Sequence, residues 1–229
     1  MQAVDFGDYY PIESLESSQS LSTCARMQTG DVKCWGENTY GQLGVGDKIN
    51  RGHNVGDMGN TLPLLDFGTN YVSTMSYSDR VRCALLDNGK VKCWGVNNMG
   101  MLGLGHMIDN VHSPGAYVLL GTTSTVKQVK CGNWNTCVLF KNNNIKCWGI
   151  RDRTKIHGYG DDTNRGGTME TMGDNLPFIS FEDRVVALQV SDFTSATYLM
   201  FEDGRMKCWG NNAYGNLGQG TSISTPVNV

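Results

Sequence analysis

Short apolar runs separated by turns rich in Gly and Asn recur along the chain. In one unit, runs at residues 82–86 and 91–95 flank the turn Asp87-Asn88-Gly89-Lys90. This arrangement predicts a β-hairpin, because Gly and Asn accept the positive φ angles of a tight turn. Three more units share it, with turns at residues 28–31, 141–144 and 202–205. We therefore expect an all-β chain of short strands.

A Lys-Cys-Trp-Gly tetrapeptide forms the second run of each hairpin. Successive copies are 59, 54 and 61 residues apart, and a period of this size indicates a tandem array. We treat residues 1–229 as one array, with repeats at approximately 4–64, 65–117, 118–177 and 178–229. Repeats one and three have long connectors at 56–63 and 171–177, whereas repeats two and four have shorter ones around 113–114 and 225–226. The loops along one side of the array should therefore alternate between a long and a short form.

Cysteine spacing predicts a disulfide across each of the first three hairpins. A second cysteine stands ten residues before the first three motif cysteines, so the two should face each other on paired strands. The expected pairs are Cys24–Cys34, Cys83–Cys93 and Cys137–Cys147. Reduced, buried cysteines are the alternative, and zinc is disfavoured because CxxC pairs are missing. Tyr198 replaces the partner of Cys208, which leaves Cys131 and Cys208 as free thiols or as a mutual pair.

The tryptophan after each motif cysteine should point to the opposite face of its strand. We expect these indoles to fill the interfaces between successive sheets, and ligand stacking is the alternative. The residues concerned are Trp35, Trp94, Trp148 and Trp209.

Composition narrows the class of protein. The chain has 29 Gly in 229 residues and is 39% hydrophobic, which suits many short strands rather than disorder. The net charge of −3 argues against a general nucleic-acid binder, and no apolar run is long enough for a membrane span. The N-terminus shows no signal-peptide pattern, so the extracellular or surface-exposed location that we expect is inferred from the cysteines alone.

The order Cys-Ala-Leu…Gly…Val-Lys-Cys-Trp-Gly-x-Asn-x-x-Gly-x-Leu-Gly-x-Gly, seen at residues 83–105, resembles the repeat of the regulator of chromosome condensation family. Its paired cysteines resemble those of the family's secreted and surface proteins. The resemblance implies a β-propeller with one four-stranded sheet, or blade, per repeat. Four blades are few for a propeller. The array could close alone, be completed by another chain, or stack into a filament.

The third repeat departs from this pattern at residues 150–160, where the Asn-x-x-Gly is missing. Its basic replacement is a candidate interaction loop, and sequence drift is the alternative. The Asp161-Asp162 pair that follows suggests a cation-binding loop, and a solvated turn is the alternative. The candidate loop residues are Arg151, Arg153, Lys155 and His157.

No recurring or paired set of reactive residues points to catalysis or to a cofactor. We therefore expect a non-catalytic structural or interaction module, whose partner is protein, in self-assembly or on another surface protein, with glycan as a second class. Two alternatives follow from the resemblance alone: a secreted inhibitor of an enzyme, and a guanine-nucleotide exchange or chromatin-associated factor.

Overall fold

The computed structural model describes residues 3–8, 11–17, 21–109, 111–122, 125–150, 156–192 and 196–223. Its strands form four antiparallel sheets of three strands, each in chain order. Sheet 1 contains β1 (Ile12–Ser17), β2 (Ser22–Met27) and β3 (Val32–Gly36), and sheet 2 contains β4 (Val72–Tyr77), β5 (Val81–Leu86) and β6 (Val91–Gly95). Sheet 3 contains β7 (Val126–Cys131), β8 (Asn135–Phe140) and β9 (Ile145–Gly149), and sheet 4 contains β10 (Val185–Val190), β11 (Ala196–Phe201) and β12 (Met206–Gly210).

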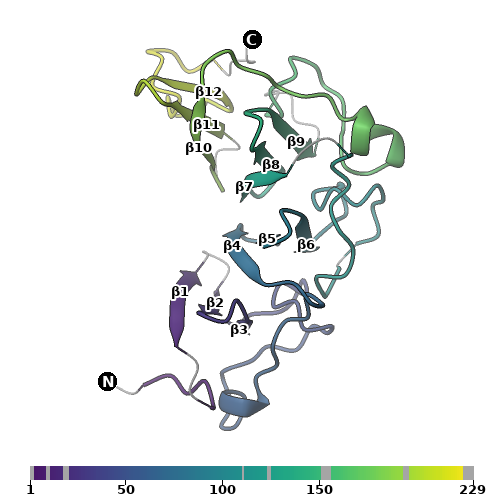
Figure 1. Cartoon of the computed structure of the whole chain (residues 1–229), viewed down its shortest axis with the longest axis vertical. Coiled ribbons are helices and arrows are strands. Elements are labelled where there is room, and N and C mark those ends of the chain that lie inside the picture. The colour runs from purple at the N-terminus through teal and green to yellow at the C-terminus, as the bar shows by residue number, and fades with distance from the viewer. Residues whose placement is uncertain are drawn as a thin grey trace.

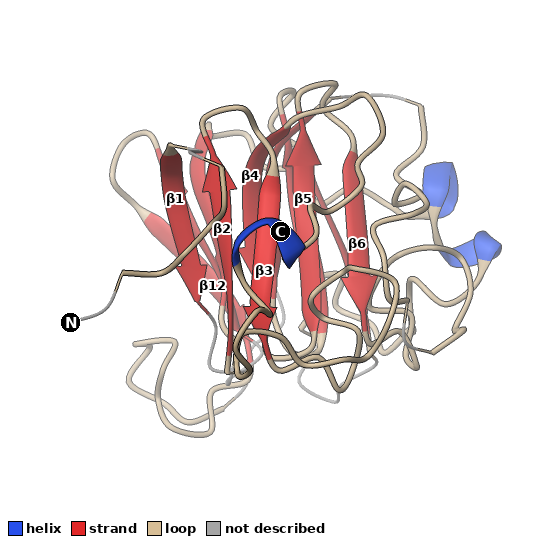
Figure 2. Cartoon of the chain, turned by 90° about the horizontal axis from the view of Figure 1, so that it is seen from below, coloured by secondary structure: helices blue, strands red, loops and turns tan. Residues whose placement is uncertain are grey.

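The four sheets follow one another along an open arc, with the chain termini at its two ends (Figure 1). The first strand of each sheet lies on the concave side of the arc, and these strands contact their counterparts in neighbouring sheets. The third strand of each sheet lies towards the convex side. Seen from below, the strands of neighbouring sheets run side by side, and loops gather at their ends (Figure 2).

Each hairpin has the register that its sequence predicts. Cys83 pairs with Cys93 across β5 and β6, and the turn between them places Gly89 at φ 74°. Asn143 takes the same turn position in sheet 3, also at φ 74°. The first strand of every sheet carries a bulge at one place, after Ile12, Val72, Val126 and Val185.

The expectation of four strands per blade is corrected, because each sheet has three. The fourth position is occupied in sheets 1 to 3 by two isolated bridges to the connector, such as Gly36 with Arg51 and Lys33 with Leu64. Between these bridges the connector leaves the sheet, so a continuous strand cannot form. In sheets 1 and 3 the excursion includes the 3₁₀ turns η1 (Gly59–Thr61), η2 (Met169–Thr171) and η3 (Gly173–Asn175). Among the described residues, no helix is long and apolar enough to cross a membrane.

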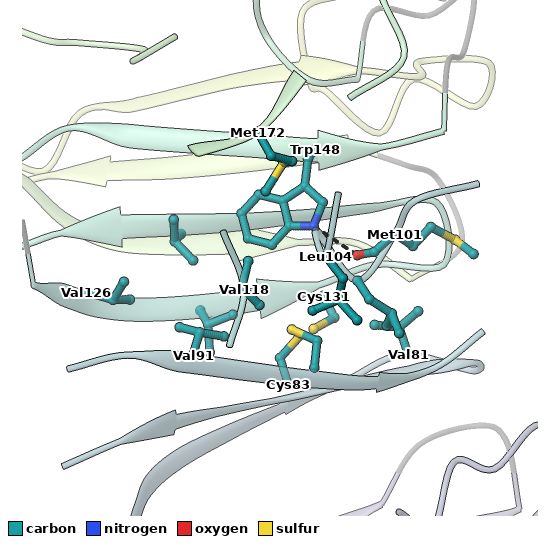
Figure 3. Close-up of a cluster of buried hydrophobic side chains, with 14 of the residues drawn as sticks. Val81, Cys83, Val91, Met101, Leu104, Val118, Val126, Cys131, Trp148 and Met172 are labelled. Carbon is teal, nitrogen blue, oxygen red and sulfur yellow. Dashed lines mark hydrogen bonds between the residues drawn. A yellow bond between two sulfur atoms is a disulfide. The ribbon is translucent and has the colours of Figure 1, made fainter. Parts of the chain in front are cut away.

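The hydrophobic core lies between the sheets rather than at one centre. We call the face of a sheet that carries its tryptophan the front face, and the face that carries its half-cystines the back face. The back face of each sheet packs on the front face of the next, as Cys83 and Val91 do on Val126, Cys131 and Trp148 (Figure 3). Equivalent clusters join sheet 1 to sheet 2 and sheet 3 to sheet 4. Each repeat therefore depends on its neighbours for burial.

Candidate functional site

Three disulfides join the hairpins of sheets 1 to 3. Their Cα atoms lie 4.1 Å apart, as expected for directly opposed residues, and the half-cystines are buried at the sheet interfaces. The bonds join Cys24 to Cys34, Cys83 to Cys93, and Cys137 to Cys147. Three disulfides in one short chain are typical of an oxidising compartment.

Cys131 and Cys208 are free and lie on different sheets. Cys131 is buried between sheets 2 and 3, and burial raises the pKa of its thiol to about 12. Cys208 is half-buried on β12, with its Sγ 3.3 Å from the carbonyl oxygen of Leu217. Partial burial raises the pKa of the Cys208 thiol as well. Neither thiol has the lowered pKa of a reactive cysteine.

Three of the four motif tryptophans fasten one sheet to the next. The indole nitrogens of Trp94, Trp148 and Trp209 donate to backbone carbonyls in the loop of the preceding repeat, at 3.1, 3.0 and 3.0 Å. The accepting carbonyls belong to Gln42, Met101 and Ile156. A Gly two residues further on leaves room for the indole: a Cβ at Gly44 would lie 2.6 Å from the Trp94 nitrogen. Trp35 has no preceding sheet in the chain, and it is half-buried against Phe6.

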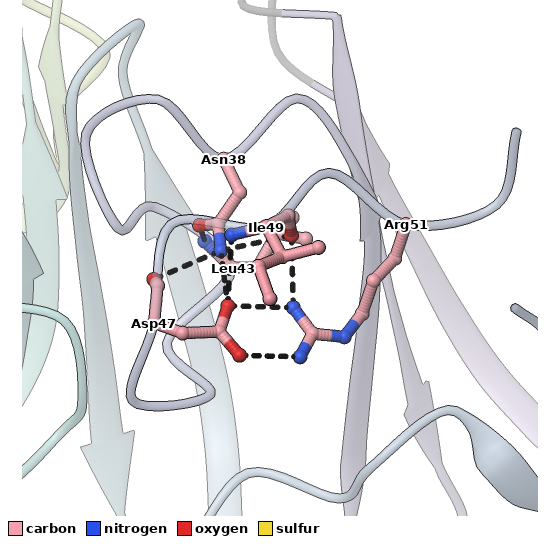
Figure 4. Close-up of polar contacts among 5 residues, drawn as sticks. All are labelled: Asn38, Leu43, Asp47, Ile49 and Arg51. Carbon is pink, nitrogen blue, oxygen red and sulfur yellow. Dashed lines mark hydrogen bonds and ion pairs between the residues drawn. The ribbon is translucent and has the colours of Figure 1, made fainter.

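One asparagine organises the loop after the hairpin in repeats one, two and four. The Asn38 side chain donates to the carbonyls of Asp47 and Ile49 and accepts from the amide of Leu43, while Arg51 holds Asp47 in a two-pronged ion pair (Figure 4). Asn97 and Asn212 make the corresponding bonds. The Asn residues of this motif therefore have a structural role.

The candidate interaction loop of the third repeat is described only in part. Arg151, Arg153 and Lys155 lie outside the described residues. His157 is only 5% exposed, because it takes the position that Leu43 and Leu102 occupy in the other loops. A side chain this buried offers little surface to a partner, and the interaction role of the loop stays a prediction.

Asp161 lies in a bend and is held by an ion pair. Both carboxylate oxygens of Asp161 accept from Arg165, at 2.8 and 2.7 Å, as Asp47 does from Arg51. The Arg165 guanidinium holds the pKa of the Asp161 carboxyl well below its usual range. Among the described residues, no group of His, Cys, Asp or Glu is arranged to hold a metal ion.

The buried lysines of the tetrapeptide were not anticipated. Lys33 donates to the carbonyls of Phe6 and Gly59, and Lys146 donates to those of Leu120 and Gly173. These carbonyls belong to the long connectors and to the segments that dock on them. The alternation of long and short connectors could have indicated these buried lysines, since the long connectors of repeats one and three supply the accepting carbonyls of Gly59 and Gly173.

Two exposed surfaces remain for a partner. A groove of about 700 Å³ lies between sheets 2 and 3 at the hairpin-turn end, where Lys90, Tyr117 and Asp174 line it. The opposite end carries the loops 37–50, 96–109 and 211–223, which we call the loop rim. Because β-strands alternate in direction, all three loops leave their sheets at that end. The loop rim exposes the apolar or aromatic side chains of Ile49, Met99, Met107, Ile108, Tyr214 and Ile223.

Comparison with known proteins matches the repeats directly. A family model described as the regulator of chromosome condensation (RCC1) repeat matches residues 20–42 and 126–151. The ultraviolet-B receptor UVR8 of Arabidopsis thaliana is 24% identical over 204 residues, covering 88% of this chain and 42% of the receptor. The human E3 ubiquitin-protein ligase HERC2 is 26% identical over 204 residues, covering 84% of this chain and 4% of the ligase. The chain thus spans less than half the length of these relatives.

Solved structures give the same fold. Human WBSCR16 superposes with a TM-score of 0.76 at 18% identity, covering 96% of this chain and 53% of that one. Yeast RCC1 (Prp20), solved bound to Kap60, gives 0.72 at 18% identity, covering 98% of this chain and 49% of that one. The likeness therefore extends over the whole array and over about half of each solved chain. This chain contains repeats that match the regulator of chromosome condensation (RCC1) repeat, and its four sheets correspond to part of the propellers of human WBSCR16 and yeast RCC1.

Proposed function

We propose that this chain is a non-catalytic interaction module of an extracellular or surface-exposed propeller, and that its loop rim binds a protein. The observation that carries the proposal is the set of exposed apolar and aromatic side chains on that rim. Met107 and Ile108 stand beside each other on the repeat-two loop, and Tyr214 is almost fully exposed on the repeat-four loop. Apolar and aromatic groups gathered at one exposed end favour protein contact over a free surface.

The disulfides support the location part of the proposal. Each one closes a loop of about ten residues and stabilises its hairpin by about 3 kcal/mol, which benefits a protein outside the cell. The net charge of −3 and these disulfides weigh against a chromatin-associated exchange factor in a reducing compartment. The solved propeller bound to Kap60 supports protein binding as a use of this fold. Glycan binding and inhibition of an enzyme stay as predictions from sequence.

Site-specific photo-crosslinking tests the proposal. A photoreactive amino acid at Ile108 is incubated with the cell-surface protein fraction of the native source, and the same probe at Leu64 serves as the matched control. Both side chains are exposed, but Leu64 pairs with Lys33 near the opposite end of β3. We expect a discrete protein adduct from position 108 and none from position 64. Adducts only at position 64, or none at any loop-rim position, would refute it.

A further inference from the structure

The contact that joins neighbouring sheets is made three times inside the chain. At the hairpin-turn end, the amide of Val72 donates to the carbonyl of Gly30 at 3.2 Å, and that of Val126 donates to the carbonyl of Gly89 at 3.1 Å. In the third interface, the amide of Val185 donates instead to the side-chain oxygen of Asn143 at 2.6 Å. At the loop rim, each indole of the next sheet reaches the loop carbonyl of the preceding repeat, as described above. The apolar back face of one sheet fills the space between these two bonds. The interface therefore has a fixed pattern of donors, acceptors and buried side chains.

The front face of sheet 1 has the donor half of this pattern, and among the described residues only the N-terminal segment around Phe6 packs on it, against Trp35. Leu15 is 63% exposed, whereas its register equivalents Met75, Val129 and Leu188 are 9%, 3% and 2% exposed. Trp35 is half-buried, in contrast to the fully buried indoles of the other sheets. An apolar face of this kind is normally covered in a repeat array.

The back face of sheet 4 has the acceptor half, and no sheet of the described part of the chain packs on it. Met206 is 65% exposed, whereas Val32, Val91 and Ile145 in the same position are at most 1% exposed. A Cβ at Gly218 would meet nothing within 4 Å, although the equivalent Gly44 lies against an indole. The loop itself is formed as in repeats one and two, so its Asn216 carbonyl is in place to accept.

That carbonyl accepts the Tyr198 hydroxyl at 3.1 Å and keeps a second lone pair. The corresponding carbonyl of another repeat also accepts two hydrogen bonds. The carbonyl of Met101 accepts both the Trp148 indole and the Thr136 hydroxyl.

We propose that a second copy of this chain packs head to tail, with the front face of its sheet 1 on the back face of sheet 4. The bulk of the two faces is complementary. Tyr198 replaces a smaller half-cystine on the back face, and Ser17 replaces the larger Tyr77 or Val190 of other sheets on the front face. The proposal uses sheet faces and is independent of the loop-rim partner proposed above.

Because the arc is open and its two ends are complementary, two copies related by a two-fold axis would satisfy both ends at once.

An engineered disulfide tests the contact directly. Pro11 and Tyr71 hold the same position, since each carbonyl accepts the first amide of its hairpin turn. A Cβ at Gly30 would lie 2.7 Å from the Cβ of Tyr71, so Gly204 of one copy should lie equally close to Pro11 of the next. The test variant is Pro11→Cys with Gly204→Cys, and the matched control is Gly30→Cys with Tyr71→Cys, both with Cys208→Ser. We expect covalent dimers from the test variant and a bond within one chain from the control.

Sedimentation equilibrium of the unmodified chain gives a readout without added cysteines. We expect a species of twice 25.1 kDa that Leu15→Glu and Met206→Glu each convert to monomer. The loop-rim variant Ile108→Glu should remain dimeric, which separates this result from failure of the proposed function. A wild-type monomer at all attainable concentrations would overturn the proposal, as would free test cysteines beside a formed control bond. A larger oligomer that both variants dissociate would overturn the two-copy ring in favour of a filament.

Discussion

Each residue of the Lys-Cys-Trp-Gly motif has a separate structural role. In sheet 3 the lysine binds connector carbonyls, the cysteine closes the hairpin, and the tryptophan reaches back to the previous repeat. The final Gly ends the strand at positive φ, between 105° and 134° in Gly36, Gly95, Gly149 and Gly210. Alternation along a strand makes this division possible, since neighbouring side chains point to opposite faces.

Lys146→Met should destabilise the chain more than Lys207→Met. Lys146 is buried and donates to the carbonyls of Leu120 and Gly173, which would be left without their donor. We expect a loss of about 2 kcal/mol in the free energy of unfolding, because the buried ammonium makes two charge-assisted hydrogen bonds that methionine cannot replace. Lys207 has the same motif position but is exposed, so its replacement should change stability by less than about 0.5 kcal/mol. Urea denaturation of both variants measures the difference, and equal losses would contradict the assigned role.

Asp192 should make stability fall as the pH rises. Burial, with the charge of Asp79, raises the pKa of the Asp192 carboxyl to about 6, above its usual 3.8. The folded state then binds the proton more tightly than the unfolded state, so its stability is greatest at low pH and declines between about pH 4 and 6.

We expect Asp192→Asn to raise the free energy of unfolding by on the order of 1 kcal/mol at pH 7 and to leave it nearly unchanged at pH 4. Asp161→Asn should show the opposite sign, because Arg165 lowers the pKa of Asp161. Denaturation at the two pH values decides, and a loss of stability in Asp192→Asn at pH 7 would contradict the account.

At the scale of elements, the hairpins follow from local sequence. Equal spacing about the turn fixes which residues of two strands face each other, so Cys24 and Cys34 could be placed opposite each other. The missing fourth strand could not be predicted, because the place where the connector leaves the third strand of its sheet depends on contacts between segments distant in the sequence. The burial of His157 could not be predicted, because a polar residue in a buried leucine position leaves no signal in one sequence.

Sheet 4 offers a test of hairpin register, because Tyr198 is paired with Cys208 where the other sheets have a disulfide. Tyr198→Cys should form a fourth disulfide with Cys208 and stabilise the hairpin by about 2–3 kcal/mol. Intact mass before and after reduction, with a thermal melt, measures both effects. A variant that keeps two additional free thiols under oxidising conditions would contradict the register.

At the scale of the whole molecule, burial between sheets determines what can be predicted. Four repeats and their order are evident from the period alone. The open shape of the arc could not be predicted from the sequence, because its curvature depends on how each back face packs on the next front face. The exposure of Leu15 and Met206 becomes informative only when register equivalents elsewhere in the same chain are seen to be buried. A repeat protein therefore carries its own internal comparison.

The central claim is that the three hairpin disulfides of this RCC1-type array form in an oxidising compartment. It is tested most directly by counting reactive thiols in protein isolated from its native source. After denaturation without a reductant, alkylation followed by intact mass measurement should label only Cys131 and Cys208. After reduction, all 8 cysteines should be labelled. Labelling of all 8 cysteines before reduction would contradict the claim, because the three hairpins would then lack their disulfides in the native protein.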